Sequence, residues 1–378
     1  MHARRRSALF RCVEGLMRGG RLWLSALGRS LPGETTDKHR IKAADRFVGN
    51  RAVHSSLTEI YAATARWLLR DARSVVLAVD WTGAGAKHCV LSAGICHQGR
   101  TLPILSRGYP KHLVNNQEIQ EQFLAELAVI IPAQCTPIIV TDAGFLLRWF
   151  DAVRQHGWHF VGRVRARTRV CLKGTWHPLQ TIHRLATRRA KSLGKCPLRR
   201  RNPQTHRLIL AKEPRPLGRS RKTRSGSQGQ SSDDKDFSRA AHEPWLLATS
   251  LSCNPNAVIR VYGLRTQIEQ TFRDFKNRRY GWAFSDIRTN SSQRIDVLLL
   301  CASLANIGLR FIATAAELSS LERGFQANAI RKRRVISLFA LARHVLRANI
   351  HIHPKLLTQA ARSVASRLGD NSPLATKK

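Results

Sequence analysis

Two short apolar segments, each leading into an aspartate, place the strongest constraint on how this chain can fold. Residues 75–79 run into Asp80, and residues 137–141 run into Asp142. Apolar runs of this length between turn signals are typical of strands buried on both faces. The surrounding pattern predicts further strands at 89–97, 101–106, 158–164 and 245–249 and helices at 117–131 and 145–156. This alternation predicts an α/β fold built on a mixed sheet.

Three carboxylates are the candidate catalytic groups. Asp80 and Asp142 are expected at the margin of the sheet, where ligands of α/β proteins gather. Glu269 lies in a segment that reads as helical from 256 to 277. Hard cations prefer oxygen ligands, so the three side chains could hold two Mg²⁺ or Mn²⁺ ions for phosphoryl transfer, which predicts DNA cleavage. Taken singly, either aspartate could equally be a turn residue or a helix cap.

A second pattern lies along the predicted helix. Tyr262, Arg265, Glu269 and Lys276 fall within about 60° of one another on a helical surface. Beside this stripe lie apolar residues that would pack inward: Val261, Leu264, Ile268, Phe272 and Phe275. One flank of the helix therefore presents a carboxylate beside cations. The alternative is a solvated face whose charges form weak exposed pairs.

The balance of charge points to a polyanionic partner. The chain carries 64 Lys plus Arg against 24 Asp plus Glu, a formal net charge of +40. Such an excess repels itself in a compact state, so nucleic acid is the first candidate partner. Residues 38–42, with Arg46 and Arg51, would place cations on a helix face suited to phosphates. A merely solvated face is the alternative.

No membrane partner is expected. The apolar run at 295–318 is the only candidate span, and it contains Asn306 and Arg310, which favours a buried helix. The first 21 residues lack the uninterrupted apolar core of a secretory signal. The eight cysteines form no CxxC pair. They predict reduced core thiols in a cytoplasmic protein, without a zinc site or disulfide framework.

The spacing of the helical stripe resembles the signature of a known enzyme family. With Asp80 and Asp142, it is similar to the cut-and-paste insertion-sequence transposases of the DDE class, in the group that carries the Y-(2)-R-(3)-E-(6)-K signature (the insertion-sequence-four family). The resemblance extends over nearly the whole chain. Matching segments are residues 27–32, 38–39, 45–46, 49–50, 79–81, 141–145, 269–274 and 325–328.

The resemblance implies an RNase H-like catalytic core that is interrupted by a β-rich insertion and flanked by helical N- and C-terminal regions. The expected parts are a DNA-binding region at 1–70, core at 71–165, insertion at 166–252, core at 253–318 and a basic C-terminal region at 319–378. Residues 219–236 are expected to form a flexible basic loop that the family does not share. The basic run at 331–334 is expected to open a helix that reaches Arg347.

The resemblance also implies a reaction and its partners. A homodimer would hold two terminal inverted repeats in a synaptic complex, nick them, form and open hairpin ends, and transfer the strands into target DNA. By analogy, Tyr262, Arg265 and Lys276 would bind phosphates near the cleaved end. Trp245 would flip a base, although packing in the core is an equal alternative for its indole. The expected location is the bacterial cytoplasm, at the nucleoid.

Two other functions fit the same residues. One is a catalytically silent DNA-binding protein derived from a transposase, and the other is an RNase H-like nuclease without strand transfer. Both would keep the basic surface and its salt-dependent affinity for DNA. The products formed on DNA therefore distinguish the three functions.

Overall fold

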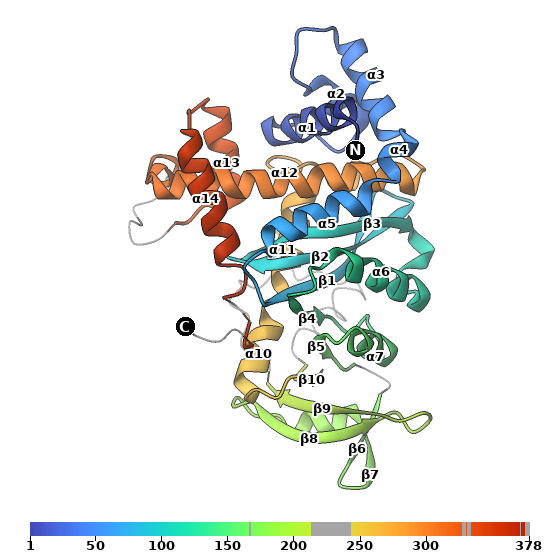
Figure 1. Cartoon of the computed structure of the whole chain (residues 1–378). Coiled ribbons are helices and arrows are strands. Elements are labelled where there is room, and N and C mark those ends of the chain that lie inside the picture. Colours follow the sequence, from blue (N-terminus) through green and yellow to red (C-terminus); the bar gives the residue numbers. More distant parts are fainter. Residues whose placement is uncertain (166–167, 213–242, 327–329, 331–333, 371, 375–378) are drawn as a thin grey trace, which may run out of the picture. The chain divides into compact units, whose positions relative to one another are not determined.

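The computed structural model describes residues 1–165, 168–212, 243–326, 330, 334–370 and 372–374 (Figure 1). The flexible loop expected at 219–236 lies outside these residues. The chain forms two units: the first contains Met1–Ile138 and Leu264–Lys378, and the second contains Ile139–Gly263. Both units combine strands with helices, and the N- and C-terminal regions are helical, so the predicted α/β fold class is confirmed. The predicted division into five parts stays a prediction.

An antiparallel meander of three strands forms the sheet of the first unit. β1 (Ser74–Ala84) pairs with β2 (His88–His97), and β2 pairs with β3 (Arg100–Pro110). Gln98 and Gly99 join β2 to β3 with φ of 48° and 81°. Positive φ at both central residues gives a two-residue turn the twist that an antiparallel hairpin needs.

Strand β1 continues beyond the aspartate that was expected to end it. The apolar run stops at Asp80, but the ladder with β2 continues from Asp80 opposite Ser92 to Ala84 opposite His88. Asp80 therefore lies inside a strand, and the predicted strand end was wrong. The side-chain pattern changes there while the backbone pairing does not, because pairing depends on backbone groups.

Helices make up the N-terminal part of the first unit. These are α1 (Ala3–Arg18), α2 (Leu24–Arg29), α3 (Asp37–Val48), α4 (Arg51–His54) and α5 (Leu57–Leu68). Helices α2 and α3 pack closely at Gly28, where an added Cβ would lie 2.4 Å from the Ile41 Cα. Only glycine allows this approach of the two helices. A sixth helix, α6 (Gln117–Ile130), packs against α5 and β3.

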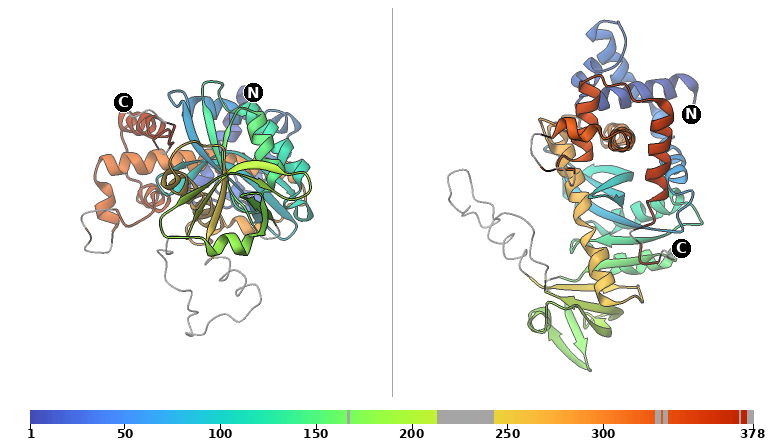
Figure 2. Two further views of the ribbon diagram at one scale, coloured as in Figure 1. Left: turned by 90° about the horizontal axis from the view of Figure 1, so that it is seen from below. Right: turned by 90° about the vertical axis from the view of Figure 1, so that its left-hand side faces the viewer.

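The long helix α12 (Ser292–Leu318) is the core of the first unit. It contacts β3, α1, α13 (Leu338–Arg347) and α14 (Pro354–Ser366), and Figures 1 and 2 show it running between α13 and α14. Its length and hydropathy would allow a membrane span, but 78% of its most apolar window is buried inside the protein. The prediction of a buried helix is confirmed.

The second unit is rich in strands. β4 (Thr136–Thr141) enters it from residue 139 onward, and the remaining strands follow in the spatial order β5 (His159–Arg163), β10 (Trp245–Thr249), β9 (Gln204–Ala211), β8 (Lys191–Leu198), β6 (Arg169–Leu172) and β7 (Thr175–Pro178). Its helices are α7 (Leu147–Gln155), α8 (Leu179–Arg184) and α10 (Pro255–Gly263). In chain order, β6 to β9 lie between β5 and β10.

Two predicted helices have different bounds in the structure. The single helix expected at 256–277 is two helices, α10 (Pro255–Gly263) and α11 (Thr266–Lys276). The break follows Gly263, and glycine costs about 1 kcal/mol relative to alanine inside a helix. The start expected at 331–333 lies outside the described residues, and α13 begins at Leu338, where the Ser337 Oγ accepts a hydrogen bond from the Ala340 N–H at 3.1 Å. That serine cap fixes the start of α13.

Candidate active site

Helix α11 carries two of the four predicted site residues of the first unit, Glu269 and Lys276. It contacts all three strands of the meander, and its buried residues include Ile268, Phe272 and Phe275. These apolar side chains repeat at helical spacing and define the inward face. Glu269 and Lys276 lie on a different face, as the stripe pattern predicts, and Arg265 directly precedes the helix in helical conformation.

One guanidinium group lies between two of the three predicted catalytic carboxylates. The Arg265 Nη1 is 2.5 Å from the Glu269 Oε1 and 3.7 Å from the Asp80 Oδ2. The side chains of Arg265 and Asp80 are 17% and 15% exposed, whereas Glu269 is 43% exposed. The pair of carboxylates thus shares one cation, and one member of the pair is open to solvent.

Lys276 lies near enough to Asp80 to interact with it electrostatically. Burial lowers the pKa of Lys276, and the negative charge of Asp80 acts in the opposite direction. The Lys276 side chain is in the last turn of α11, about two helical turns from Glu269. Asp80 is therefore flanked by two cations, Arg265 and Lys276, that come from one helical segment.

Each aspartate also accepts a local backbone hydrogen bond, from the next residue of the strand for Asp80 and from two residues on, as in a turn, for Asp142. The Asp80 Oδ1 accepts from the Trp81 N–H at 2.8 Å, and the Asp142 Oδ1 accepts from the Gly144 N–H at 2.8 Å. Asp142 directly follows β4, in the second unit, and is half-buried. Such bonds fix the orientation of a carboxylate. For Asp80, the other oxygen is the one that faces Arg265.

Trp245 and Tyr262 contact each other within the second unit. Their ring centroids are 4.8 Å apart with an angle of 74° between the planes, an edge-to-face arrangement. Tyr262 is 3% exposed, whereas Trp245, the first residue of β10, is half-buried. Tyr262 belongs to α10, so the predicted stripe of four residues is divided between α10 and the segment that begins with Arg265. The indole of Trp245 is packed on one side and partly exposed, so the structure is compatible both with core packing and with base flipping.

The carboxylate oxygens around Arg265 are of the type that binds divalent cations. The guanidinium acts as a stand-in positive charge that lies within 4 Å of one oxygen from Asp80 and one from Glu269. Carboxylate oxygens are the ligands of Mg²⁺ and Mn²⁺. Within the described residues, no three His, Cys, Asp or Glu side chains gather into a group that could hold a metal ion. Two carboxylates of the first unit thus flank a cation position without completing a site.

The eight cysteines do not contribute a metal site. All are free, and six are buried. Burial raises the pKa of the Cys96 and Cys135 thiols to about 12, so they stay protonated at neutral pH. This agrees with the absence of zinc-ligand spacing in the sequence.

Helix α3 presents part of the expected basic face. Lys38, Lys42 and Arg46 are exposed, and so is Arg51 on α4. Arg40 instead turns toward the protein, where it donates to the Leu31 carbonyl oxygen and pairs with Asp37. The basic run therefore contains exposed cations, which repeat every four residues along α3, and one arginine that makes contacts within the protein.

Sequence reasoning missed the contact between Arg265 and Asp80. The spacing of Arg265 and Glu269, four residues apart, indicates their mutual ion pair. The approach of Asp80 depends on how α11 lies on β1, which no local pattern encodes.

Residues 72–306 match a family model described as "Transposase DDE domain", which covers more than half of the chain and includes all seven predicted site residues. A comparison with curated proteins gives no match.

Proposed function

Because the chain belongs to the transposase DDE domain family, we propose that it binds the terminal inverted repeats of an insertion sequence, cleaves them and joins them to target DNA. The observation that supports this best is the shared cation: Arg265 lies between the carboxylates of Asp80 and Glu269. Two carboxylates held so close repel each other unless a positive charge separates them. Divalent ions bound between the two carboxylates would neutralise the same repulsion, which is what a metal-dependent nuclease requires of its catalytic carboxylates.

Asp80, Asp142 and Glu269 are the proposed ligands of two divalent ions, Mg²⁺ or Mn²⁺. When bound, such ions activate an attacking oxygen and neutralise charge on the leaving oxygen of a phosphoryl transfer. The chain's own contribution is orientation. The Trp81 N–H holds one oxygen of Asp80, and the Gly144 N–H holds one oxygen of Asp142. The proposal requires the second unit to bring Asp142 to the two carboxylates of the first.

Arg265, Lys276 and Tyr262 are the proposed phosphate-binding residues. A guanidinium that pairs with a carboxylate without DNA can make a two-point contact to a phosphate, because its N–H groups match the spacing of two phosphate oxygens. Lys276 offers a point charge beside Asp80. Tyr262 is buried, and its ring packs against Trp245. Its contribution to phosphate binding would therefore be made by the hydroxyl group.

Trp245 is the proposed base-flipping residue at the hairpin step. Its half-exposed indole is supported from one side by Tyr262. A rigid, partly exposed ring can cap the gap that an extruded base leaves in the DNA stack. Trp245→Ala should therefore nick end DNA at close to the wild-type rate and form hairpins at least about 10-fold more slowly, with Trp245→Phe intermediate. A gel assay that resolves nicked and hairpin products tests this.

The exposed cations of α3 are proposed to bind end DNA as part of the region at 1–70. Each phosphate contact made by Lys38, Lys42 or Arg46 contributes about one unit to the slope of log affinity against log salt. The active form would be a homodimer that joins two ends in a synaptic complex. Such a protein acts at the bacterial nucleoid.

A cleavage assay on cognate terminal repeats with Mg²⁺ tests the proposal. Wild-type protein should nick the ends, and Asp80→Ala, Asp142→Ala and Glu269→Ala should each abolish nicking without loss of end binding. Asp151→Asn is a matched control, because Asp151 is a carboxylate of the second unit that hydrogen-bonds Gln204. Activity that survives any of the three alanine substitutions contradicts the metal triad. Binding without cleavage would indicate the silent protein, and cleavage without integration would indicate the nuclease.

A further inference from the structure

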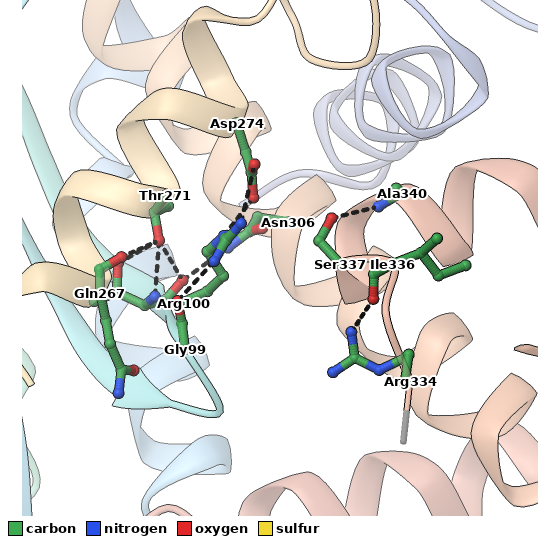
Figure 3. A network of polar contacts seen from close by, with 11 residues as sticks. Gly99, Arg100, Gln267, Thr271, Asp274, Asn306, Arg334, Ile336, Ser337 and Ala340 are labelled. Atoms are coloured by element: carbon green, nitrogen blue, oxygen red, sulfur yellow. Dashed lines mark hydrogen bonds and ion pairs between the residues drawn. The ribbon is translucent and has the colours of Figure 1, made fainter. Parts of the chain in front are cut away.

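Helix α11 is attached to β3 by a buried network of hydrogen bonds (Figure 3). The Thr271 Oγ1 accepts from the Thr101 N–H at 2.7 Å and donates to the Gln267 carbonyl oxygen at 3.0 Å. Asn306 of α12 donates to the carbonyl oxygen of the same Thr101 at 3.1 Å. Thr271 and Thr101 are 2% and 0% exposed. One backbone position of β3 thus connects two helices.

An ion pair forms a second attachment next to the first. Arg100 at the start of β3 donates to Asp274 of α11 through both Nε and Nη2, at 2.6 and 3.4 Å. The two side chains are 25% and 19% exposed. A two-point pair of this kind has a defined geometry, because the guanidinium fork matches the carboxylate. The pair therefore restricts rotation as well as separation of the two elements.

Both attachments lie opposite the predicted catalytic face of the helix. At about 100° per residue, Thr271 is about 200° from Glu269, and Asp274 is about 140° from it after a full turn is subtracted. Their mean direction is about 170° from Glu269. Hydrogen bonds on this face fix the angle of α11 about its own axis, and so they fix the direction in which Glu269 and Arg265 point.

We propose that Thr271 and Asp274 are positioning residues that set the rotation of α11 on β3 and thereby direct the Glu269 carboxylate toward Asp80. The inference rests on the proposed function for its reaction. Side-chain ends lie about 5–6 Å from a helix axis, so a rotation of about 15° moves the carboxylate by about 1.5 Å. Metal–oxygen distances tolerate about 0.2 Å, and a displacement of about 1 Å can cost about 100-fold in rate.

The apolar face of α11 cannot set this angle alone. Ile268, Phe272 and Phe275 bury the helix against the meander, but the hydrophobic effect is not directional. A buried hydrogen bond is directional, and it penalises every arrangement that leaves the Thr101 N–H without a partner. The network therefore selects one rotation among those that the apolar packing would accept.

Thr271→Val is the test variant, because valine has the shape of threonine and lacks the hydroxyl. Thr249→Val is the matched control. Thr249 is also 2% exposed, and its hydroxyl likewise accepts from a backbone N–H, that of Leu251, and donates to a carbonyl oxygen, that of Phe160. Both variants remove one accepted and one donated bond, and Thr271→Val also removes the contact at 3.0 Å between the Thr101 and Thr271 hydroxyl groups. Thr271→Ser keeps the hydroxyl and is the rescue variant.

The readouts separate positioning from stability. With saturating end DNA, Thr271→Val should nick about 30-fold more slowly than Thr249→Val at temperatures where both are folded. Its midpoint for Mg²⁺ should rise about five-fold, its affinity for end DNA should change less than about three-fold, and Thr271→Ser should restore the rate to within about three-fold. Equal rates and equal Mg²⁺ midpoints for Thr271→Val and Thr249→Val would overturn the inference.

A second set of measurements covers failure of folding or of the proposed function. If Thr271→Val does not fold, Asp274→Asn and Arg100→Lys replace it, because their half-buried pair is less costly to alter, and the same rise in the Mg²⁺ midpoint is expected. If wild-type protein does not cleave, the proposed function fails while the inference is still decided by Mn²⁺ binding, measured by electron paramagnetic resonance. Thr271→Val should then bind Mn²⁺ about five-fold more weakly than Thr249→Val, and equal affinities would reject positioning.

Discussion

Among the described residues of the first unit, one arginine lies between two carboxylates at Arg265 and again at Arg107, and the two clusters differ in how closed they are. Arg265 lies between Asp80 and Glu269. Arg107 of β3 lies between Glu126 of α6 and Asp296 of α12. The three residue types and the charge balance are nearly the same, so the difference between the clusters depends on geometry and burial.

The Arg107 cluster is closed by several hydrogen bonds, although the Arg107 Nη1 is buried without one. Arg107 donates to Glu126 through both Nε and Nη2, Thr58 donates to Glu126 as well, and the Gly108 N–H donates to Asp296 at 2.7 Å. The side chains of Arg107, Glu126 and Asp296 are 12%, 23% and 17% exposed. Such a cluster joins β3, α6 and α12 and cannot exchange partners without exposing buried charge.

The Arg265 cluster has the opposite character. Glu269 is 43% exposed, and the Arg265 Nη1 lies 2.5 Å from its Oε1. A cation that enters from solvent can reach this carboxylate without breaking a buried ion pair of Glu269. The comparison teaches that an arginine between two carboxylates is structural when closed and exchangeable when open.

The largest expected effect is on catalysis at the open cluster. Glu269→Gln should lower the nicking rate by about 1,000-fold or more, because a proposed metal ligand loses its charge. Its melting temperature should change by less than about 2 °C, since a half-exposed pair contributes little to stability. Glu126→Gln should do the reverse, with a large loss of stability and near-normal nicking by the folded fraction. Similar profiles for the two variants would contradict the contrast between the clusters.

The next effect is on stability at the closed cluster. Arg107→Met removes the shared cation from two buried carboxylates and should lower the free energy of unfolding by about 3–5 kcal/mol. Arg265→Met should lower it by less than about 1 kcal/mol. Urea unfolding followed by tryptophan fluorescence measures both. Comparable losses would show that the Arg265 cluster is closed as well.

A smaller effect is expected on metal affinity. Arg265→Ala removes the cation that a divalent ion must displace, so the DNA-free protein should bind Mn²⁺ about 3- to 10-fold more tightly, and its affinity for end DNA should fall. Arg278→Ala is the control, since Arg278 forms an exposed pair with Asp286 in the same unit. Paramagnetic resonance titration gives the affinities, and an unchanged or weaker affinity for Arg265→Ala argues against exchange.

The smallest effect concerns pH. Burial raises the pKa of Asp296 to about 7, although Gly108 and Arg107 act in the opposite direction. The folded chain therefore keeps a proton that an unfolded aspartate releases near pH 4, so this carboxyl lowers stability progressively as pH rises from about 4 to 7. Asp296→Asn should remove that loss of stability. The melting temperature of the variant minus that of wild type should therefore increase by about 2 °C as the pH is raised from 5 to 8. Parallel pH profiles in calorimetry would contradict it.

Much of the architecture was predictable from local patterns. Apolar runs identified the strands that carry or precede Asp80 and Asp142, and the length and composition of residues 295–318 identified the buried helix α12. Fold class follows from such patterns because each element must bury one face. The end of β1 and the break after Gly263 were not found, because backbone pairing and helix continuity do not follow side-chain polarity.

The candidate site was only partly predictable. Glu269 and Lys276 of the predicted stripe both lie on α11, and the i, i+4 spacing agrees with the ion pair of Arg265 and Glu269. The contact of Arg265 with Asp80 joins residues 185 positions apart in the chain. The anchoring of α11 by Arg100 and Thr101 likewise depends on the tertiary arrangement. Patterns within one element cannot report on partners in another.

The order of synthesis follows from the way the first unit is assembled from two stretches of chain. Asp80 precedes Glu269 by 189 residues, and the whole of the second unit is made between them. At about 5–20 residues per second, a ribosome needs about 10–40 s to cross that interval. During this time, the proposed DNA-binding helices of residues 1–70 have already emerged while α11 has not. On the proposed function, synthesis of the DNA-binding region therefore precedes completion of the carboxylate cluster by tens of seconds.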